Sequence, residues 1–478
     1  MVDSAHLPEL PLMVAGVPEP VVAVLRRTGL PTKELPKIPL AADGTGRFLL
    51  FDSRVPSSVT RMRTARKQGL EPIDLAEIDT SLPGGLWDFE DDPGSASNSL
   101  KNGPKAFLEQ LKLRLESLGG VWLRIADYPY PFRSALAVGI VHGESPVPQP
   151  YACGITLTHF LGSRLREEDL RGLWFADPHE LGWAVDGDDI EATSRKTQSR
   201  WRTRMDRFRE AGREIEGYRC EPRSAGLPSL AEQVRLGLRY RVECERAVSS
   251  GRPAWDFDKG EQVRLSLEDA SRLMDGSPGD ALGTVLRLDH ESRRAGRLDA
   301  DHVLNSSVIA LPSALRPVLL SRIASSRSFE EWFRTRVESG APMFLEVAAE
   351  LADFPGLQKL AILADGSPFL WKCTFSQFAR WQMARRRTCA VVRRTGEGYE
   401  VQLPRDVTAG GFAAVGFTAE LWRGGHVARL PLASEGLSIP DEGVLYQPAE
   451  GACPGGTSVP ATPREVRPTG LRKTGSNG

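Results

Sequence analysis

Residues 134–141 read SALAVGIV, an unbroken run of small and apolar side chains. A run of this composition predicts a β-strand that is buried on both faces, as in a parallel sheet. Further strand-like runs lie at 151–160 (YACGITLTHF) and 343–348 (MFLEVA), and longer helical patterns such as 193–212 separate them. This alternation predicts a parallel sheet or barrel with helices outside, whose functional site lies at the carboxyl ends of the strands.

The N-terminal region carries a compact β-α-β pattern. RFLLF (47–51) is typical of a short apolar strand, residues 57–68 of a polar helix, and LEPIDL (70–75) of a second strand. Residues 83–104 are rich in Gly, Pro, Asp, Ser and Asn, a composition that indicates a loop or linker. A helix with one apolar face is then predicted over 107–118, and two glycines follow it.

The C-terminal part of the chain switches to a period of two, which predicts short antiparallel strands. These runs are TCAVVRR (388–394), YEVQL (399–403), GFAAVGFT (411–418), AELWR (419–423) and HVARLPL (426–432). We therefore divide the chain into an N-terminal α/β domain (1–120), a central α/β domain (121–387), a small antiparallel β domain (388–450) and a disordered tail (451–478) rich in Gly, Pro, Thr and Ser.

Composition and charge exclude several classes of function. The 478 residues include 61 basic and 62 acidic side chains, so the formal net charge of −1 provides no global field for nucleic acid or an anionic membrane. The six cysteines form no CxxC pair, which argues against a zinc knuckle or a dithiol redox motif. The N-terminus makes a poor signal peptide, and no window has the roughly 20 apolar residues of a membrane helix. We expect a cytoplasmic protein without nucleic-acid or membrane partners.

Two predicted helices are rich in arginine. In 193–212, Trp201, Met205 and Phe208 recur at helical spacing, which predicts one apolar face against the core and a solvated basic remainder. In the helix 374–387 the aromatic residues again have helical spacing, and arginines fill the last turn, where they complement the helix dipole. The residues concerned are Phe375, Phe378, Trp381, Arg385, Arg386 and Arg387. Core packing explains both helices without a nucleic-acid partner, with a solvated basic face on the first helix and a charged C-terminus on the second.

Four segments between residues 123 and 381 carry a family likeness. They are YPYPFRSALAVGIVHGE (128–144), ITLTHFL (155–161), HELGWAVDGDD (179–189) and EGYRCEP (216–222). In this order and spacing they resemble the polysaccharide deacetylase family, also called the NodB-homology or carbohydrate esterase 4-like family. The resemblance implies a deformed (β/α) barrel of the glycoside hydrolase and deacetylase type, and an ancestral activity that removed acetyl groups from a carbohydrate with the help of a metal ion.

The same resemblance implies which residues would carry the chemistry, and most of them are replaced. The two aspartates of the family fall on Val141 and Gly143, and its two metal-binding histidines fall on Ala184 and Asp188. Arg219 falls on the arginine that orients the catalytic aspartate. Of the four metal-site and base positions only Asp188 could bind a metal, and one carboxylate cannot hold a divalent ion by itself. We therefore expect no metal cofactor.

The leading hypothesis is a catalytically degenerate deacetylase-like protein that binds a carbohydrate or a protein partner. The alternative is an active, zinc-dependent carbohydrate deacetylase, a hydrolase of carbon–nitrogen amide bonds, with ligands relocated to His142, Glu144, His179 and Asp188 and with Arg219 kept. A second alternative is a scaffold or assembly protein. A structural role competes with each of these side chains: His179 and Glu180 resemble a structural lead-in to a strand, and His142 can be a hydrogen-bonded imidazole at a strand end. The sequence leaves open whether the protein is an enzyme.

Overall fold

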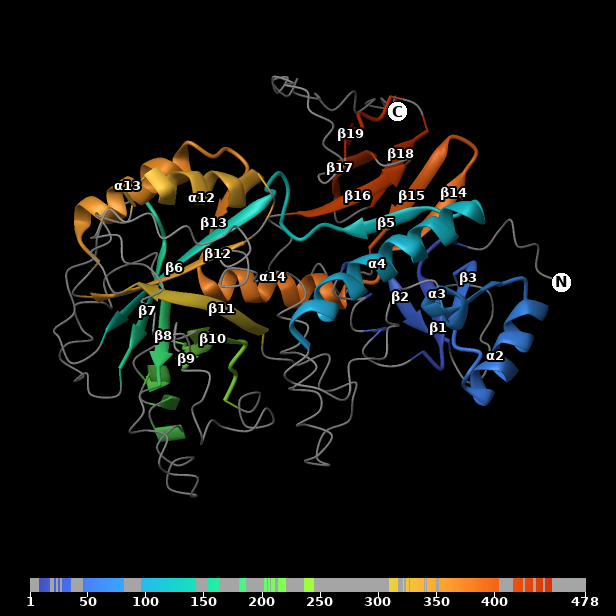
Figure 1. The fold of residues 1–478 in the computed structure, drawn as a ribbon, viewed down its shortest axis with the longest axis horizontal. Helices are drawn as coiled ribbons and strands as arrows, with labels where there is room; N and C mark the ends of the chain where they lie inside the picture. Colours follow the sequence, from blue (N-terminus) through green and yellow to red (C-terminus); the bar gives the residue numbers. More distant parts are fainter. Residues whose placement is uncertain are drawn as a thin grey trace, which may run out of the picture.

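The computed structural model of the protein has two regions of parallel sheet and two antiparallel sheets, connected by helices (Figure 1). It describes residues 8–17, 21–22, 25, 28–35, 46–80, 96–142, 154–162, 180–185, 202–203, 205–206, 208–210, 214–220, 236–244, 309–316, 321, 324–325, 327–338, 340, 342–349, 352–403, 416–423, 426–432, 436–441 and 443–448. The predicted tail, 451–478, lies outside these residues.

The N-terminal sheet is parallel, with the strand order β2-β1-β3-β4. Its elements are β1 (Leu12–Ala15), β2 (Thr32–Glu34), β3 (Phe48–Phe51), α2 (Pro56–Lys67), β4 (Glu71–Asp74) and α3 (Leu75–Thr80). β3, α2 and β4 confirm the predicted β-α-β unit. β1 and β2 were not predicted, because strands of four and three residues carry too little periodicity to stand out in the sequence.

Helix α4 (Ala96–Ser117) is longer than predicted. The prediction of a loop or linker over 83–104 is wrong for its last residues, because these belong to the helix. The second half of α4 is anchored by the buried side chains of Phe107, Leu111 and Leu115. Once a helix is nucleated and packed, extending it by a few residues costs little, so a Gly- and Ser-containing stretch can follow the anchored half.

The second parallel sheet has the strand order β12-β11-β10-β9-β8-β7-β6-β13, and β12 pairs in addition with β6 (Figure 1). Its strands are β6 (Ser134–His142), β7 (Leu157–Leu161), β8 (Glu180–Ala184), β9 (Gly217–Cys220), β10 (Tyr240–Cys244), β11 (Ile309–Arg316), β12 (Met343–Ala348) and β13 (Leu370–Lys372). All described pairings between them are parallel. The predicted strands SALAVGIV and MFLEVA are confirmed as β6 and β12.

The strands of this sheet are buried on both faces, as the sequence predicts. On β6, Leu136, Val138 and Ile140 pack with the outer helices α12 (Arg327–Glu338) and α13 (Phe354–Asp365). Ala135 and Ala137, one step out of phase, pack in a different cluster that includes residues of α14 (Phe375–Arg387). We call the face that α14 contacts the inner face and the face toward α12 and α13 the outer face.

The predicted basic helix at 193–212 packs as expected where it is described. Met205 and Phe208 are buried beside residues of β7, β8 and β9, while Arg202 and Arg209 are exposed. Trp201 lies outside the described residues. Among the helices that the structure describes, none combines the length and the apolar character needed to cross a membrane.

The first turn of α14 is inserted against the inner face of the parallel sheet. Phe375 is fully buried, and its ring lies 5.5 Å from that of Phe160, 6.1 Å from that of Tyr240 and 5.7 Å from that of Phe344. Glycine makes room for these rings: a Cβ at Gly139 would lie 2.6 Å from the ring of Phe160, so any larger residue would displace it.

Polar groups fix the start of α14. Thr374 caps the helix through a capping box with Gln377. The carboxylate of Glu180 accepts one hydrogen bond from the backbone N–H of Ser376, at 3.0 Å, and another from the hydroxyl of Tyr240. Burial, together with the negative charge of Glu180, raises the pKa of Tyr240 well above its ordinary value, so the phenol remains a donor.

The C-terminal region forms two antiparallel sheets, as predicted. One has the order β14-β15-β18, and the other β19-β17-β16-β5. Their strands are β5 (Trp122–Ile125), β14 (Val391–Thr395), β15 (Gly398–Gln402), β16 (Phe417–Arg423), β17 (His426–Leu432), β18 (Leu437–Pro440) and β19 (Gln447–Pro448). β16 joins the end of the strand expected over 411–418 to the whole of the one expected over 419–423. β5, which precedes the parallel sheet in the chain, pairs with β16.

The N-terminal and C-terminal regions share one hydrophobic core. Leu12 and Phe48 from the first parallel sheet, Phe107 from α4, Trp381 from α14 and Phe417 from β16 belong to the same buried cluster. The domain boundaries at 120, 387 and 450 stay a prediction, but residues on both sides of the central region pack together. α14 extends from the parallel sheet toward this shared core (Figure 1).

We predict that Phe375→Ala destabilises the protein by about 3–5 kcal/mol, because it leaves a cavity among rings that cannot collapse into it. Ile362→Ala on α13 is the matched control: this side chain is 62% exposed, and its truncation should cost less than about 0.5 kcal/mol. Urea unfolding followed by circular dichroism measures both changes. Equal, small effects of the two substitutions would contradict the buried position of Phe375.

Candidate functional site

The inner face near the carboxyl ends of the parallel strands is the location at which the sequence analysis places the site. Register brings Val141 of β6 beside Ala348 of β12, and Ala184 of β8 beside Arg219 of β9. Ala184 is buried in the inner cluster, and the partly buried Val141 packs against it. Two positions where the family resemblance implies a carboxylate and an imidazole therefore carry apolar side chains in an apolar environment.

Arg219 has a carboxylate partner that the sequence analysis did not identify. Leu345 and Val347 of β12 face the outer helices, so Glu346 between them faces inward, where its Oε1 lies 3.3 Å from the Nε of Arg219. The Arg219 side chain is 8% exposed and that of Glu346 is fully buried. The sequence does contain one sign of this ion pair, which is the single glutamate inside the otherwise apolar strand MFLEVA. A charge that is buried in a strand requires a partner of opposite charge.

His142 lies on the outer face of the sheet. It continues the outward series of Val138 and Ile140, and its Nε2 lies 2.9 Å from the Nδ1 of His159 on β7. Both imidazoles are buried, and their rings are stacked with centroids 5.1 Å apart. Burial lowers the pKa of His142 to about 4, so this side chain is neutral near pH 7.

The other candidates cannot be placed beside His142. Gly143, Glu144, His179 and Asp188 lie outside the described residues. Within the part of the chain that the structure describes, no group of three or more His, Cys, Asp or Glu side chains could hold a metal ion. The described residues at the positions implied by the resemblance do not fit such an ion, because Val141 and Ala184 have no ligand atoms.

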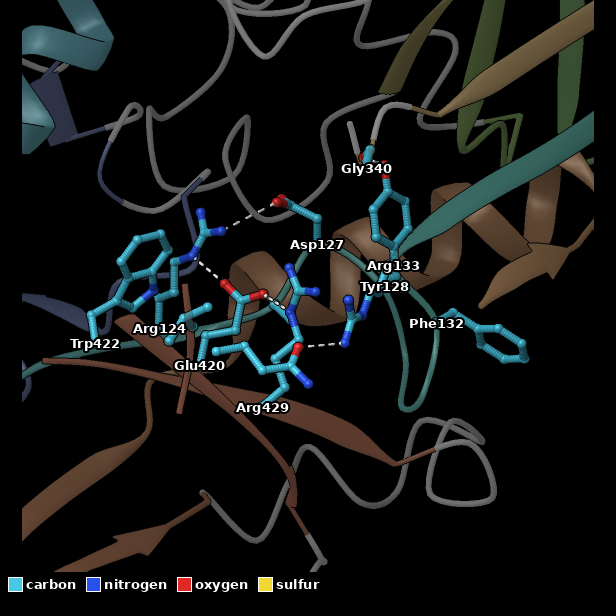
Figure 2. Close-up of a pocket in the computed structure, with 12 residues that line it drawn as sticks. Arg124, Asp127, Tyr128, Phe132, Arg133, Gly340, Glu420, Trp422 and Arg429 are labelled. Atoms are coloured by element: carbon cyan, nitrogen blue, oxygen red, sulfur yellow. Dashed lines mark hydrogen bonds and ion pairs between the residues drawn. The ribbon is translucent and has the colours of Figure 1, made fainter. Parts of the chain in front are cut away.

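A pocket of about 220 Å³ lies elsewhere, between the parallel sheet and the antiparallel sheet of β5, β16, β17 and β19 (Figure 2). It is lined by residues of β5 and the segment that follows it, by residues of β16, β17 and β19, and by Gly340 ahead of β12. The lining residues are Arg124, Ala126, Asp127, Tyr128, Phe132, Arg133, Gly340, Glu420, Trp422, Val427, Arg429 and Gln447.

A buried carboxylate between two arginines forms the centre of this pocket. β16 is flanked by β5 and β17, and register sets Glu420 opposite both Arg124 and Arg429. The Nε of Arg124 lies 2.6 Å from one carboxylate oxygen of Glu420, and the Nε of Arg429 lies 2.8 Å from the other (Figure 2). Burial acts to raise the pKa of Glu420, but the two guanidinium groups outweigh it and lower that pKa.

The same network continues to α14. Asp127 forms an ion pair with Arg385, whose Nη2 lies 2.9 Å from its Oδ1, while the Nε of Arg385 donates to the backbone carbonyl of Ile125 at 2.9 Å. The Arg385 side chain is 1% exposed. The sequence predicted a charged last turn, but it did not reveal that Arg385 is buried there, where strand β5 and Asp127 supply the partners that let a guanidinium be buried. Burial lowers the pKa of Arg385.

Comparison with known proteins identifies no family. No protein-family model matches the chain, and no curated protein matches it. Among solved structures, the chain is weakly similar to the crystal structure of a "putative polysaccharide deacetylase" from Mycobacterium smegmatis, with a TM-score of 0.31 and 13% sequence identity. The match covers 55% of this chain and 94% of that one. A TM-score this low does not establish a common fold.

We predict that His142 makes the protein sensitive to acid. Its pKa of about 4 in the folded state lies below the ordinary 6.5, so the unfolded chain binds the proton more readily. The stability contributed by the neutral imidazole is complete above pH 6.5 and is lost as the pH falls toward 4, by about 3 kcal/mol at most. Urea unfolding of the wild type and of His142→Gln at a series of pH values tests this. The variant should show a shallower loss between pH 6.5 and 4, and equal slopes would contradict the assignment.

We further predict that Arg219 and Glu346 are strongly coupled. Glu346→Gln and Arg219→Met should each destabilise the protein by about 3 kcal/mol, because each leaves one buried charge without its counter-charge. The double variant should be more stable than the sum of the two effects implies, with a coupling energy of about 1–3 kcal/mol. Additive effects in a double-mutant cycle would show that the two side chains do not interact.

Proposed function

We propose that the chain is a deacetylase-like protein that has lost metal-dependent catalysis and binds a carbohydrate or a protein partner. The observation that carries this proposal is the inner face of the parallel sheet at the strand ends, where Val141 and Ala184 lie at positions for which the resemblance implies a carboxylate and an imidazole, and where Glu346 is paired with Arg219. We infer also that the sheet is a deformed (β/α) barrel. The pairing of β6 with both β7 and β12 supports this inference.

The chemistry of amide hydrolysis supports the loss of activity. A metal ion that polarises an acetyl carbonyl and activates water is held by three protein ligands in sites of this kind. On the inner face, the described strand ends offer one carboxylate, that of Glu346, and the guanidinium of Arg219 neutralises it. Breaking that ion pair to bind a metal would leave Arg219 charged and buried, which costs several kcal/mol.

The position of His142 argues against the alternative of an active zinc enzyme with relocated ligands. Its imidazole contacts His159 on the outer face, whereas Arg219, the residue that the resemblance implies was kept for catalysis, contacts Glu346 on the inner face. A site that used both side chains would have to span the sheet itself. The remaining ligands of that alternative, Glu144, His179 and Asp188, lie outside the described residues.

Metal analysis tests the proposal. The purified full chain is incubated with zinc or cobalt, dialysed, and analysed by inductively coupled plasma mass spectrometry, and we expect far less than one ion per chain. One tightly bound ion per chain would overturn the proposed loss of metal chemistry. If that ion is lost in His142→Ala and Asp188→Ala but kept in His426→Ala, a control on an exposed strand position, the alternative with relocated ligands is correct.

A further inference from the structure

We propose that the pocket of Figure 2 is a binding site for a small carboxylate carried on a single ring. The proposal does not rest on the loss of metal chemistry, since the pocket is built from residues that the deacetylase-like positions do not include. It specifies where the proposed ligand binds and to which chemical class that ligand belongs. Charge, available hydrogen-bond donors and shape each support it.

The pocket carries more positive than negative charge. Three guanidinium groups line it, from Arg124, Arg133 and Arg429, against two carboxylates, from Asp127 and Glu420. The excess of one positive charge is balanced by a ligand with one negative charge. Because Asp127 also pairs with Arg385 behind the pocket wall, its carboxylate does little to repel an anion.

Arg429 is held in a fixed position and has hydrogen-bond donors that are available to a ligand. Its Nε donates to the buried Glu420, with which the guanidinium forms an ion pair, while its two terminal amino groups make no hydrogen bond with any residue that the structure describes. The side chain is 26% exposed, so solvent and ligands reach it. A guanidinium can bind a carboxylate with two parallel hydrogen bonds, and one that a buried partner already orients loses little freedom when it does so.

Arg133 approaches the pocket from the opposite side. Its Nη2 donates to the side-chain oxygen of Gln447 at 2.7 Å (Figure 2). Its guanidinium also lies over the ring of Phe369, 4.9 Å from the centroid. An anion between Arg429 and Arg133 would therefore interact with two positive charges from different elements. Removal of Arg133 leaves the Glu420 ion pairs intact, which makes it the cleaner position for a test.

The size and walls of the pocket favour a ring. A volume of about 220 Å³ lies below the roughly 300–1,000 Å³ of pockets for drug-sized ligands, which favours one six-membered ring with a substituent over a chain of sugars. Tyr128, Phe132 and Val427 supply apolar wall. The hydroxyl of Tyr128 donates to the carbonyl of Gly340 at 2.7 Å, which fixes the aromatic ring in place.

Isothermal titration calorimetry of the full chain tests the proposal with two matched pairs of probes. D-Glucuronate is compared with D-glucose, and cyclohexanecarboxylate with cyclohexanecarboxamide, so each pair differs in the carboxylate while the ring is kept. We expect at least one carboxylate to bind about tenfold or more tightly than its neutral counterpart, as the loss of a charge-assisted bidentate contact implies. Binding of glucuronate alone identifies a sugar acid, and binding of cyclohexanecarboxylate identifies an apolar ring acid.

Variants locate the binding. Arg429→Gln and Arg133→Gln should each weaken the carboxylate by about tenfold, whereas Arg423→Gln should leave its affinity within about twofold. Arg423 is the matched control, since it lies on β16 but pairs with Asp441 away from the pocket. Circular dichroism shows whether each variant is folded. If Arg429→Gln does not fold, the affinity of Arg133→Gln for the carboxylate provides the test. Equal affinity for acids and neutral counterparts, no binding of either acid, or unchanged binding in folded Arg133→Gln would overturn the proposal. The metal analysis is unaffected by any of these results.

Discussion

Helix α14 places aromatic side chains in two separate hydrophobic cores. Its first turn places Phe375 among the aromatic rings on the inner face of the large parallel sheet, and two turns later Trp381 lies in the core shared by the N-terminal and C-terminal regions. The helix cannot slide along its axis without withdrawing one aromatic side chain from its core, because both cores are packed. Glu180 at one end and Arg385 at the other add polar contacts that only this position allows.

The insertion of α14 also explains why the inner face of the sheet is filled. The rings of Phe160, Tyr240, Phe344 and Phe375 pack together on this face. Arg219 and Glu346 form a buried ion pair on the same face. A buried ion pair is weak evidence for stability, but it is strong evidence against a vacant site, because each charge depends on the other. The inner face therefore resembles a packed core more than a catalytic cavity.

The pocket of Figure 2 arises from a different constraint, which is strand register. Glu420 can be buried because β5 and β17 each supply an arginine directly opposite to it on the same sheet. Once the carboxylate is bound on both sides, the guanidinium of Arg429 is held in place, and its terminal groups make no hydrogen bond with the residues that the structure describes. The pocket is thus a product of pairing between β5 and β16, segments separated by 296 residues at the contact of Arg124 with Glu420.

Local sequence patterns were enough to predict the main elements. The apolar runs of β6 and β12, the β-α-β unit of β3, α2 and β4, and the alternating strands at the C-terminus are confirmed, since each depends on side chains within one segment. The apolar identities of Val141 and Ala184 could also be recognised from the sequence alone, because they follow from the residue types. The short strands β1 and β2 were missed, since three or four residues show no period.

The tertiary structure decided everything that depends on which face a side chain occupies and on what lies opposite to it. A strand that is apolar on both faces has no alternation to show that His142 points outward and Val141 inward. The partner of Arg219 comes from β12, and those of Glu420 come from β5 and β17. These contacts join segments far apart in the chain, and their register follows from the packing of whole sheets. The sequence by itself therefore determined the kinds of element, while the fold alone decided how the buried charges are paired and where a pocket forms, because these depend on contacts between segments distant in the chain.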